Sequence, residues 1–163
     1  MPTERIGIQE MDKESTGSTD QAGQNCDIII VHPDLIDSIW PNVEPHLERI
    51  GPHSEGELTP EDFRTHLESA EMQLWLAIHD KVVLAAMITQ IIVYPRKRTV
   101  RIIAIGGDDM KRWLHYLPLV EDWGFEMGCT YLELWGRKGW KKVLSDWKSS
   151  YIVLTKEIVK RIH

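Results

Sequence analysis

The chain has 163 residues, 42% of them hydrophobic and 27% charged, with a formal net charge of −6. This length and composition fit one globular domain and exclude a disordered chain, a collagen and a coiled coil. Cys26 and Cys129 lie too far apart in the chain to indicate a Cys-rich zinc site or a disulfide framework, and no apolar run is long enough to span a bilayer. The seven histidines form no metal-binding motif. We therefore expect a cytoplasmic protein with no membrane span and no metal.

The charge is distributed unevenly along the chain. Residues 1–80 contain 4 basic and 17 acidic side chains, whereas residues 81–163 contain 15 basic and 8 acidic ones. The cations gather in residues 96–101 and 137–148, where they would offer an anion a local positive field, although solvated surface charge explains the same pattern. Residues 135–142 interleave tryptophans with Lys and Arg, as nucleic-acid-binding surfaces do. The acidic remainder of the chain would repel DNA or RNA, so nucleic acid is disfavoured as a partner.

The first third of the chain predicts an arm followed by a strand and two helices. Residues 1–25 are polar and lack periodicity, which indicates a flexible N-terminal arm, and residues 26–163 are expected to form a single domain. Ile28–Val31 predicts the first strand. Apolar residues at helical spacing over 35–47 predict a helix that Pro41 and Pro45 bend or divide. Thr59 followed by Pro60 then predicts the start of a second helix.

The remainder predicts a sheet interrupted by two helical segments. Asp108 is expected to cap the first of them, Pro118 to interrupt it, and Gly128 to end it. The other expected elements are a hairpin of strands 74–78 and 82–94, a strand 99–105, a strand 129–135, a short helix 138–147 and a closing strand 151–154. The predicted class is a mixed α/β (α+β) domain with a partly antiparallel sheet and the order β-α-α-β-β-β-α-β-α-β.

This order of elements, over about residues 27–155, is similar to that of the GCN-five-related N-acetyltransferase (GNAT) superfamily. Two stretches also resemble small GNAT-like proteins encoded by bacteriophages: "LWLAIHDKVVLAAMITQIIVYPRKRTVRIIAIGG" and "WLHYLPLVEDWGFEMGCTYLELWGRKGWKKVL". The segment "GCTYLELWGRKGW" is the most distinctive part of the match. The resemblance implies a GNAT-like fold.

The resemblance implies that acetyl-CoA would bind in the loop after the fourth strand, whose backbone N–H groups hold a pyrophosphate at a helix start. Gly106 and Gly107 stand at that place, but Asp108 and Asp109 follow them instead of the full Q/R-x-x-G-x-G/A motif and would repel the anion. Two readings stay open, a working cofactor loop over residues 105–111 and a self-capped helix on a degenerate scaffold. The residues assigned to cofactor binding are Ile105, Gly106, Gly107, Lys111, Arg112 and, toward the adenosine-end phosphate, Arg137.

The resemblance also implies a base that deprotonates the acceptor amine and a tyrosine that protonates the leaving thiolate. Glu133, on the fifth strand, is the candidate base, and a strand residue that faces solvent or pairs with a lysine is its alternative. The helix 138–147 contains no tyrosine. Tyr151, just beyond it, is the nearest substitute, and a packed aromatic ring is its alternative.

Two functions follow from these residues. The first is an N-acetyltransferase that moves an acetyl group from acetyl-CoA to a small amine or a protein amino group. The second is a catalytically silent GNAT-like interaction or structural protein of a bacteriophage particle, with phage structural proteins as its partners and the virion as a location. If the glycines cradle an anion, Gly107→Val is expected to abolish cofactor binding in a folded protein, because only glycine lets a backbone approach a phosphate closely.

Overall fold

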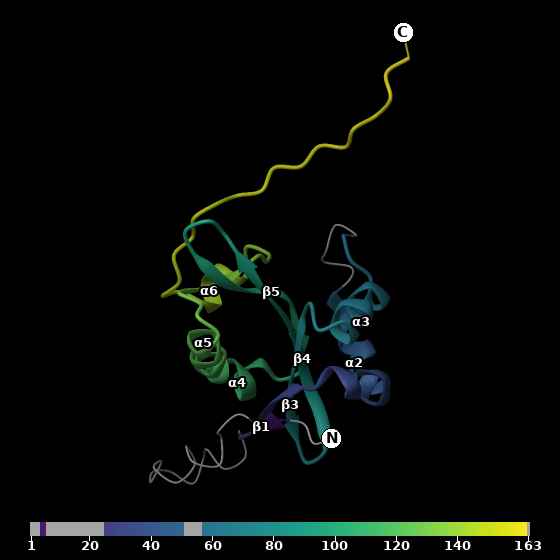
Figure 1. Ribbon diagram of the computed structural model, residues 1–163, viewed down its shortest axis with the longest axis vertical. Helices are drawn as coiled ribbons and strands as arrows, with labels where there is room; N and C mark the ends of the chain where they lie inside the picture. The colour runs from purple at the N-terminus through teal and green to yellow at the C-terminus, as the bar shows by residue number, and fades with distance from the viewer. Residues whose placement is uncertain (1–3, 6–24, 51–56, 163) are drawn as a thin grey trace.

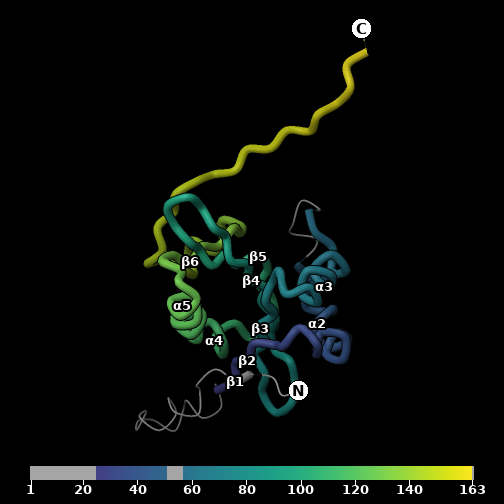
Figure 2. The backbone as a smooth tube through the Cα atoms, viewed as in Figure 1, coloured from purple at the N-terminus to yellow at the C-terminus, as the bar shows by residue number. Residues whose placement is uncertain are grey.

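The computed structural model describes residues 4–5, 25–50 and 57–162, which contain one six-stranded sheet with helices on both faces (Figures 1 and 2). The strands lie in chain order from β1 to β6, and every neighbouring pair is antiparallel except β5 and β6, which are parallel. This confirms the predicted mixed α/β class with a partly antiparallel sheet. The strands are β1 (Glu4–Arg5), β2 (Asp27–Val31), β3 (Gln73–His79), β4 (Val82–Val93), β5 (Arg98–Gly107) and β6 (Tyr131–Leu134).

One face of the sheet packs against α2 (Ile36–Ile50) and α3 (Pro60–Glu68) (Figure 1). The apolar side of α2, which includes Trp40 and Leu47, is buried against strand residues such as Ile88. Pro41 and Pro45 both lie inside α2, which continues through them as one helix, so the expected division of the helix was wrong. The buried side of the helix outweighs the two missing backbone donors, each of which costs about 3 kcal/mol in a helix interior.

The start of α3 forms as its sequence predicts. The Thr59 hydroxyl accepts a hydrogen bond from the Asp62 backbone N–H, and the Asp62 carboxylate accepts one from the Thr59 backbone N–H. Pro60 occupies the first helical position. This reciprocal capping box satisfies two otherwise unpaired donors and fixes where the helix begins.

The other face packs against α4 (Met110–Trp113), α5 (Leu117–Glu126) and α6 (Trp140–Val143). Pro118 lies in the first turn of α5, after a 3-10 turn over Leu114–Tyr116, and Gly128 follows α5 with a φ of 78°, as a helix-ending glycine does. Trp75 of β3 meets Trp123 of α5 edge to face, with ring centroids 5.3 Å apart. Trp113, Leu117, Leu119 and Val120 are buried in this layer, whereas Phe125 is exposed.

The two ends of the chain differ from the expectation. Glu4–Arg5, inside the predicted arm, form a short strand beside β2, while most of that arm lies outside the described residues. Residues 151–154 form no strand: the segment from 148 onward runs past the β4–β5 turn and away from the domain, with its apolar side chains exposed (Figure 1). The closing strand was therefore predicted wrongly, because an apolar, β-branched run becomes a strand only where it pairs with another. Helix α6 is also shorter than the expected 138–147.

Strand β5 has two strand neighbours over its first half and one over its second half, and this change positions the candidate site. Ile88 of β4 pairs with Ala104 and Thr89 with Ile102, so Ile103 is an extra residue that bulges from the ladder. The pairing between β5 and β6 ends at the same point, with Ile102 opposite Leu134. Beyond it, within the described part of the chain, residues 104–107 pair with β4 alone. A bulge bends its strand and strengthens its twist, and the pairing with β6 ends at this bend.

Candidate active site

The glycine pair closes β5 and packs against its neighbours. Gly106 and Gly107 lie inside the strand, opposite Ala86 and Ala85. A Cβ atom at Gly107 would stand 2.4 Å from the Cα atom of Ala85, whereas one at Gly106 would stand 2.7 Å from the Cγ1 atom of Ile50. The close approach that requires glycine at 107 is therefore to the β4 backbone. A bulky residue there would disrupt the sheet itself, so the expectation that Gly107→Val leaves the protein folded is wrong.

Each of the two acids that follow the glycines is paired with an arginine. The Arg49 guanidinium on α2 donates to the Asp108 carboxylate at 2.9 Å, and this hydrogen bond and charge hold the pKa of Asp108 below its usual value. The Asp109 carboxylate contacts Arg112 Nε at 2.8 Å. Asp109, and not Asp108, occupies the N-cap of α4, with a left-handed φ of 54° and no capping hydrogen bond from its side chain. The predicted cap at Asp108 was therefore wrong, because that carboxylate turns to Arg49.

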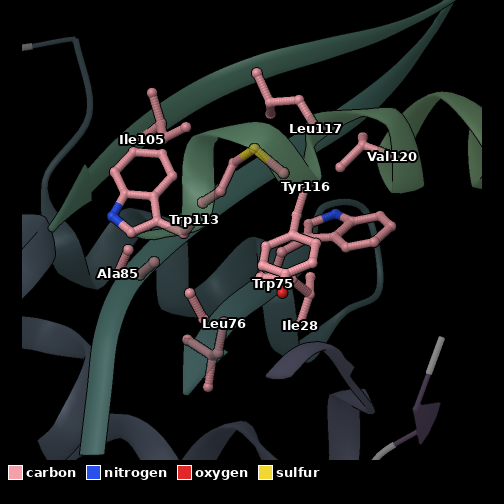
Figure 3. A pocket seen from close by; sticks show the side chains of 12 residues that line it. Ile28, Trp75, Leu76, Ala85, Ile105, Trp113, Tyr116, Leu117 and Val120 are labelled. Carbon is pink, nitrogen blue, oxygen red and sulfur yellow. The ribbon is translucent and has the colours of Figure 1, made fainter. Parts of the chain in front are cut away.

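An apolar cavity lies beside this end of β5 (Figure 3). Its volume is about 40 Å³, enough for a water molecule or a small alkyl group. Ile105 lines it from β5, Trp113 and Tyr116 from the α4 side, and Trp75 and Ile28 from β3 and β2. Of the predicted cofactor residues, Ile105 alone lines this cavity. Lys111 is exposed, and Arg112 is paired with Asp109.

The candidate base Glu133 belongs to a polar cluster on β5 and β6. Arg101 Nε donates to Glu133 Oε1 at 2.6 Å, and the same guanidinium donates to the Tyr94 hydroxyl at 2.7 Å and lies 4.0 Å from the Trp135 ring centroid. The Glu133 side chain is 24% exposed. Its other oxygen, Oε2, has no hydrogen bond to the described residues. Glu133 is thus held in place through one oxygen and open to a substrate through the other.

Glu133 and Tyr151 line the same open pocket. We call it the basic pocket; it measures about 570 Å³ and is lined by Tyr94, Pro95, Arg96, Lys97, Glu133, Trp135 and Tyr151. Tyr151 enters it from the extended C-terminal segment and is 91% exposed. The two predicted catalytic residues are therefore brought together, although they come from different parts of the chain.

Solved structures of acetyltransferases share this architecture. A ribosomal-protein-alanine N-acetyltransferase from Brucella melitensis biovar Abortus 2308 superposes with a TM-score of 0.57 at 14% identity, over 80% of this chain and 99% of that one. A probable acetyltransferase gives a TM-score of 0.58 at 16% identity, over 83% and 98%. An aminoglycoside acetyltransferase from an uncultured soil metagenomic sample, in complex with trehalose, gives 0.60 at 11% identity, over 83% and 97%. The chain has the GNAT fold.

The sequence comparisons add nothing to this fold assignment. No family model matches the chain, and no curated protein matches it either. The identities to the solved structures are low, so the likeness establishes the GNAT fold and leaves the reaction to the residues of the site. The resemblance to phage-encoded proteins remains a prediction.

Along β5 of this GNAT fold, the predicted residues form two groups. Ile105, Gly106, Gly107, Lys111 and Arg112 lie around its C-terminal end, whereas Glu133 and Tyr151 lie near Arg101, six residues away or roughly 20 Å along an extended strand. Arg137 belongs to neither: it is exposed in the turn between β6 and α6. The point where the pairing of β5 with β6 ends lies between the two groups.

Sequence reasoning missed the partners that hold Glu133. Arg101 and Glu133 are 32 residues apart, and only the parallel register of β5 and β6 sets them opposite each other. Tyr94 and Trp135 complete the cluster from the ends of β4 and β6. A charged residue inside each of two apolar strands was the available signal, since such charges are rarely buried without a partner.

The described residues lack both a cluster of metal ligands and a membrane-spanning helix. They contain no group of three or more His, Cys, Asp or Glu side chains arranged to hold a metal ion. They also contain no helix that is both long and apolar enough to cross a membrane.

Proposed function

We propose that the protein is an N-acyltransferase that moves an acetyl group from acetyl-CoA to an amine. One observation carries the proposal: the pairing of β5 with β6 ends at Ile102 and Leu134, one residue beyond Glu133. A thioester at the strand edge that this leaves open would lie next to a carboxylate whose second oxygen has no hydrogen bond to the described residues. The GNAT fold of the chain supports the same reaction.

The residues present fit an acyl-CoA. Residues 104–107 of β5 have strand pairing on the β4 side alone within the described chain, so their other edge can hydrogen-bond the amide groups of an extended ligand. The neighbouring cavity under Ile105 is apolar, as an alkyl chain requires. The arginine partners of Asp108 and Asp109 offset the negative charge that would otherwise repel a pyrophosphate near Gly107. Lys111, exposed on α4, supplies a further cation near that end of β5.

The reaction needs a group that accepts a proton from the amine and a group that donates a proton to the leaving sulfur. The acetyl-CoA supplies the acyl group as a thioester. Glu133 Oε2 accepts a proton from the acceptor amine, directly or through water, as the amine nitrogen bonds to the acyl carbon. The hydroxyl of Tyr151 donates a proton to the sulfur as the carbon–sulfur bond breaks. Arg101 keeps the Glu133 carboxylate oriented through Oε1.

Binding and turnover are tested separately. Acetyl-CoA at 100 times its dissociation constant should stabilise the folded protein by about 2.7 kcal/mol, which a thermal shift detects. Glu133→Gln keeps an oxygen that can accept from Arg101 but cannot take up a proton. It should retain acetyl-CoA binding and lose at least 100-fold in kcat. Glu126→Gln, on the exposed end of α5, is the matched control and should behave as the unmodified protein. The absence of both a shift and calorimetric heat at millimolar acetyl-CoA would refute the proposal.

A second candidate function is a catalytically silent GNAT-like structural or interaction protein. The sequence resemblance favours one form of it, a structural protein of a phage particle. Its support is that contacts within the fold already explain the residues of the loop: Gly107 packs on β4, and Asp108 and Asp109 are ion-paired. This candidate requires that a folded sample fail to bind acetyl-CoA. Mass spectrometry of purified particles tests the phage form, and absence of the protein from them would rule it out.

A further inference from the structure

We infer that the acceptor is a small amine that carries an anionic group, a carboxylate or a phosphate. The inference rests on the proposed function and assigns the substrate class of the same site. Its starting point is the charge of the basic pocket, where Arg96 and Lys97 are exposed and neither forms an ion pair with a described residue. The one acid that lines the pocket, Glu133, is already paired with Arg101.

Two tyrosine rings position Lys97 at the pocket rim. Its ammonium lies 4.6 Å from the ring centroid of Tyr131 and 5.4 Å from that of Tyr94. Aromatic rings attract a cation without neutralising it, so they position the ammonium while its charge stays available to a ligand. Arg96, beside it on the β4–β5 turn, adds a second cation.

The surroundings of the pocket carry the same sign. Arg98 begins β5, and Arg137 and Lys138 follow β6 on the turn beyond Trp135; all three are exposed. A hollow whose rim carries mostly one sign of charge concentrates ligands of the opposite sign, and the one acid in this pocket is already paired with Arg101. An anionic group on the acceptor would therefore bind at Arg96 and Lys97, with the amine toward Glu133.

The same field favours the reactive form of the amine and selects against other amines. Neighbouring cations disfavour an ammonium ion, so a bound amine is held more readily as the neutral nucleophile. A polycationic amine is repelled. The soil aminoglycoside acetyltransferase with the same fold has been solved with the aminoglycoside sisomicin; the basic pocket here disfavours that class. The pocket volume of about 570 Å³ suits a small molecule.

The test measures acceptor preference on the full chain with acetyl-CoA as donor. Phosphoethanolamine and β-alanine present an amine with a phosphate or a carboxylate, ethanolamine is the neutral counterpart, and spermidine is the polycation. We expect kcat/KM to be highest for one of the two anionic amines. Whichever of phosphoethanolamine and β-alanine has the higher kcat/KM shows whether the site prefers a phosphate or a carboxylate. The preference over ethanolamine should fall as ionic strength rises, because salt screens exposed charges.

Variants locate the effect. Arg96→Gln combined with Lys97→Gln should lower the preference for the anionic amine over ethanolamine about tenfold, mainly through KM. Lys156→Gln, on the exposed C-terminal segment, is the matched control and should leave the preference unchanged. Binding of acetyl-CoA is measured for each variant and should be the same in all.

The outcomes separate this inference from the proposed function. Equal or better turnover of ethanolamine or spermidine, with acetyl-CoA bound, overturns the anionic acceptor and leaves the acyltransferase in place. An unchanged preference in the double variant also overturns it. Failure to bind acetyl-CoA refutes the acyltransferase itself and the inference with it.

Discussion

The strongest structural prediction concerns two neighbouring glycines that the sequence does not distinguish. A Cβ atom at Gly107 would stand 2.4 Å from the Cα atom, the Cβ atom of Ala85 and the carbonyl oxygen of Leu84, all on β4. A Cβ atom at Gly106 would meet the end of the Ile50 side chain at 2.7 Å and 3.0 Å, which can move aside. Gly107→Ala therefore forces β4 and β5 apart, whereas Gly106→Ala asks one flexible side chain to change position.

The magnitudes follow from these contacts. Overpacking against rigid neighbours costs about 1–3 kcal/mol, and we place Gly107→Ala near the top, at about 3 kcal/mol. The Asp108 N–H also donates to the Leu84 carbonyl at 2.8 Å, and this bond is strained by the same displacement. For Gly106→Ala the cost is about 1 kcal/mol or less, because alanine also reduces the conformational entropy of the unfolded chain, which offsets part of the strain in the folded protein. At roughly 2–4 °C per kcal/mol, Tm falls by about 6–12 °C in the first variant and by less than about 4 °C in the second.

The assay is urea unfolding followed by the fluorescence of the seven tryptophans, with acetyl-CoA binding measured on the same samples. Equal stability losses in the two variants would refute the packing argument. So would a Gly107→Ala protein that remains as stable as the unmodified chain but no longer binds acetyl-CoA, because that result would make Gly107 an anion cradle.

Four further predictions concern the loop, the buried thiol and the C-terminal segment. Asp109 adopts a left-handed φ of 54°, so Asp109→Gly should change the free energy of unfolding by no more than about 0.5 kcal/mol while Asp109→Val costs about 1–2 kcal/mol, as chemical unfolding would measure. Arg49 holds the pKa of Asp108 below its ordinary 3.8. The stability from this pair is therefore present above that value and lost as pH falls through the folded pKa; Asp108→Asn should flatten the acid limb of a Tm–pH curve, and an unchanged limb would contradict this. Burial, with Asp27 adding, raises the pKa of the Cys26 thiol from 9.0 to about 11, so stability should fall as pH rises from 9 toward 11, and Cys26→Ala should remove that slope in urea unfolding. Residues 152–154 are exposed, so deletion of residues 152–163 should shift Tm by no more than about 2 °C; a larger loss in calorimetry would show that the segment packs on the domain.

Local signals in the sequence were sufficient for most of the fold. The capping residues Thr59 and Asp62 start α3 by contacts within four residues, and that helix begins where it was expected. The turn at Asp80 and Lys81, both with positive φ, joins the two strands of the predicted hairpin. These features depend on neighbours in the chain, which a sequence displays directly.

The C-terminal segment shows where local reasoning fails. Residues 151–154 have the composition of a strand, yet the structure gives them no strand partner within the described chain. Strand propensity measures how well side chains fit a half-buried sheet, so it has no effect on a segment that leaves the sheet. The same limit applies to Tyr151, whose place in the basic pocket follows from the course of the chain after α6 and not from any motif.

The candidate site depends on the feature hardest to find in the sequence, the extra residue at Ile103. An apolar run such as 102–105 has no mark that distinguishes a bulge from regular pairing, because every residue in it is compatible with either face of a covered sheet. The extra residue falls where the pairing with β6 ends at Leu134, so residues 104–107 keep a strand neighbour on the β4 side alone within the described chain. The sequence supplies the carboxylate of Glu133, and the proposed function places a thioester at the strand edge that this change of pairing leaves open.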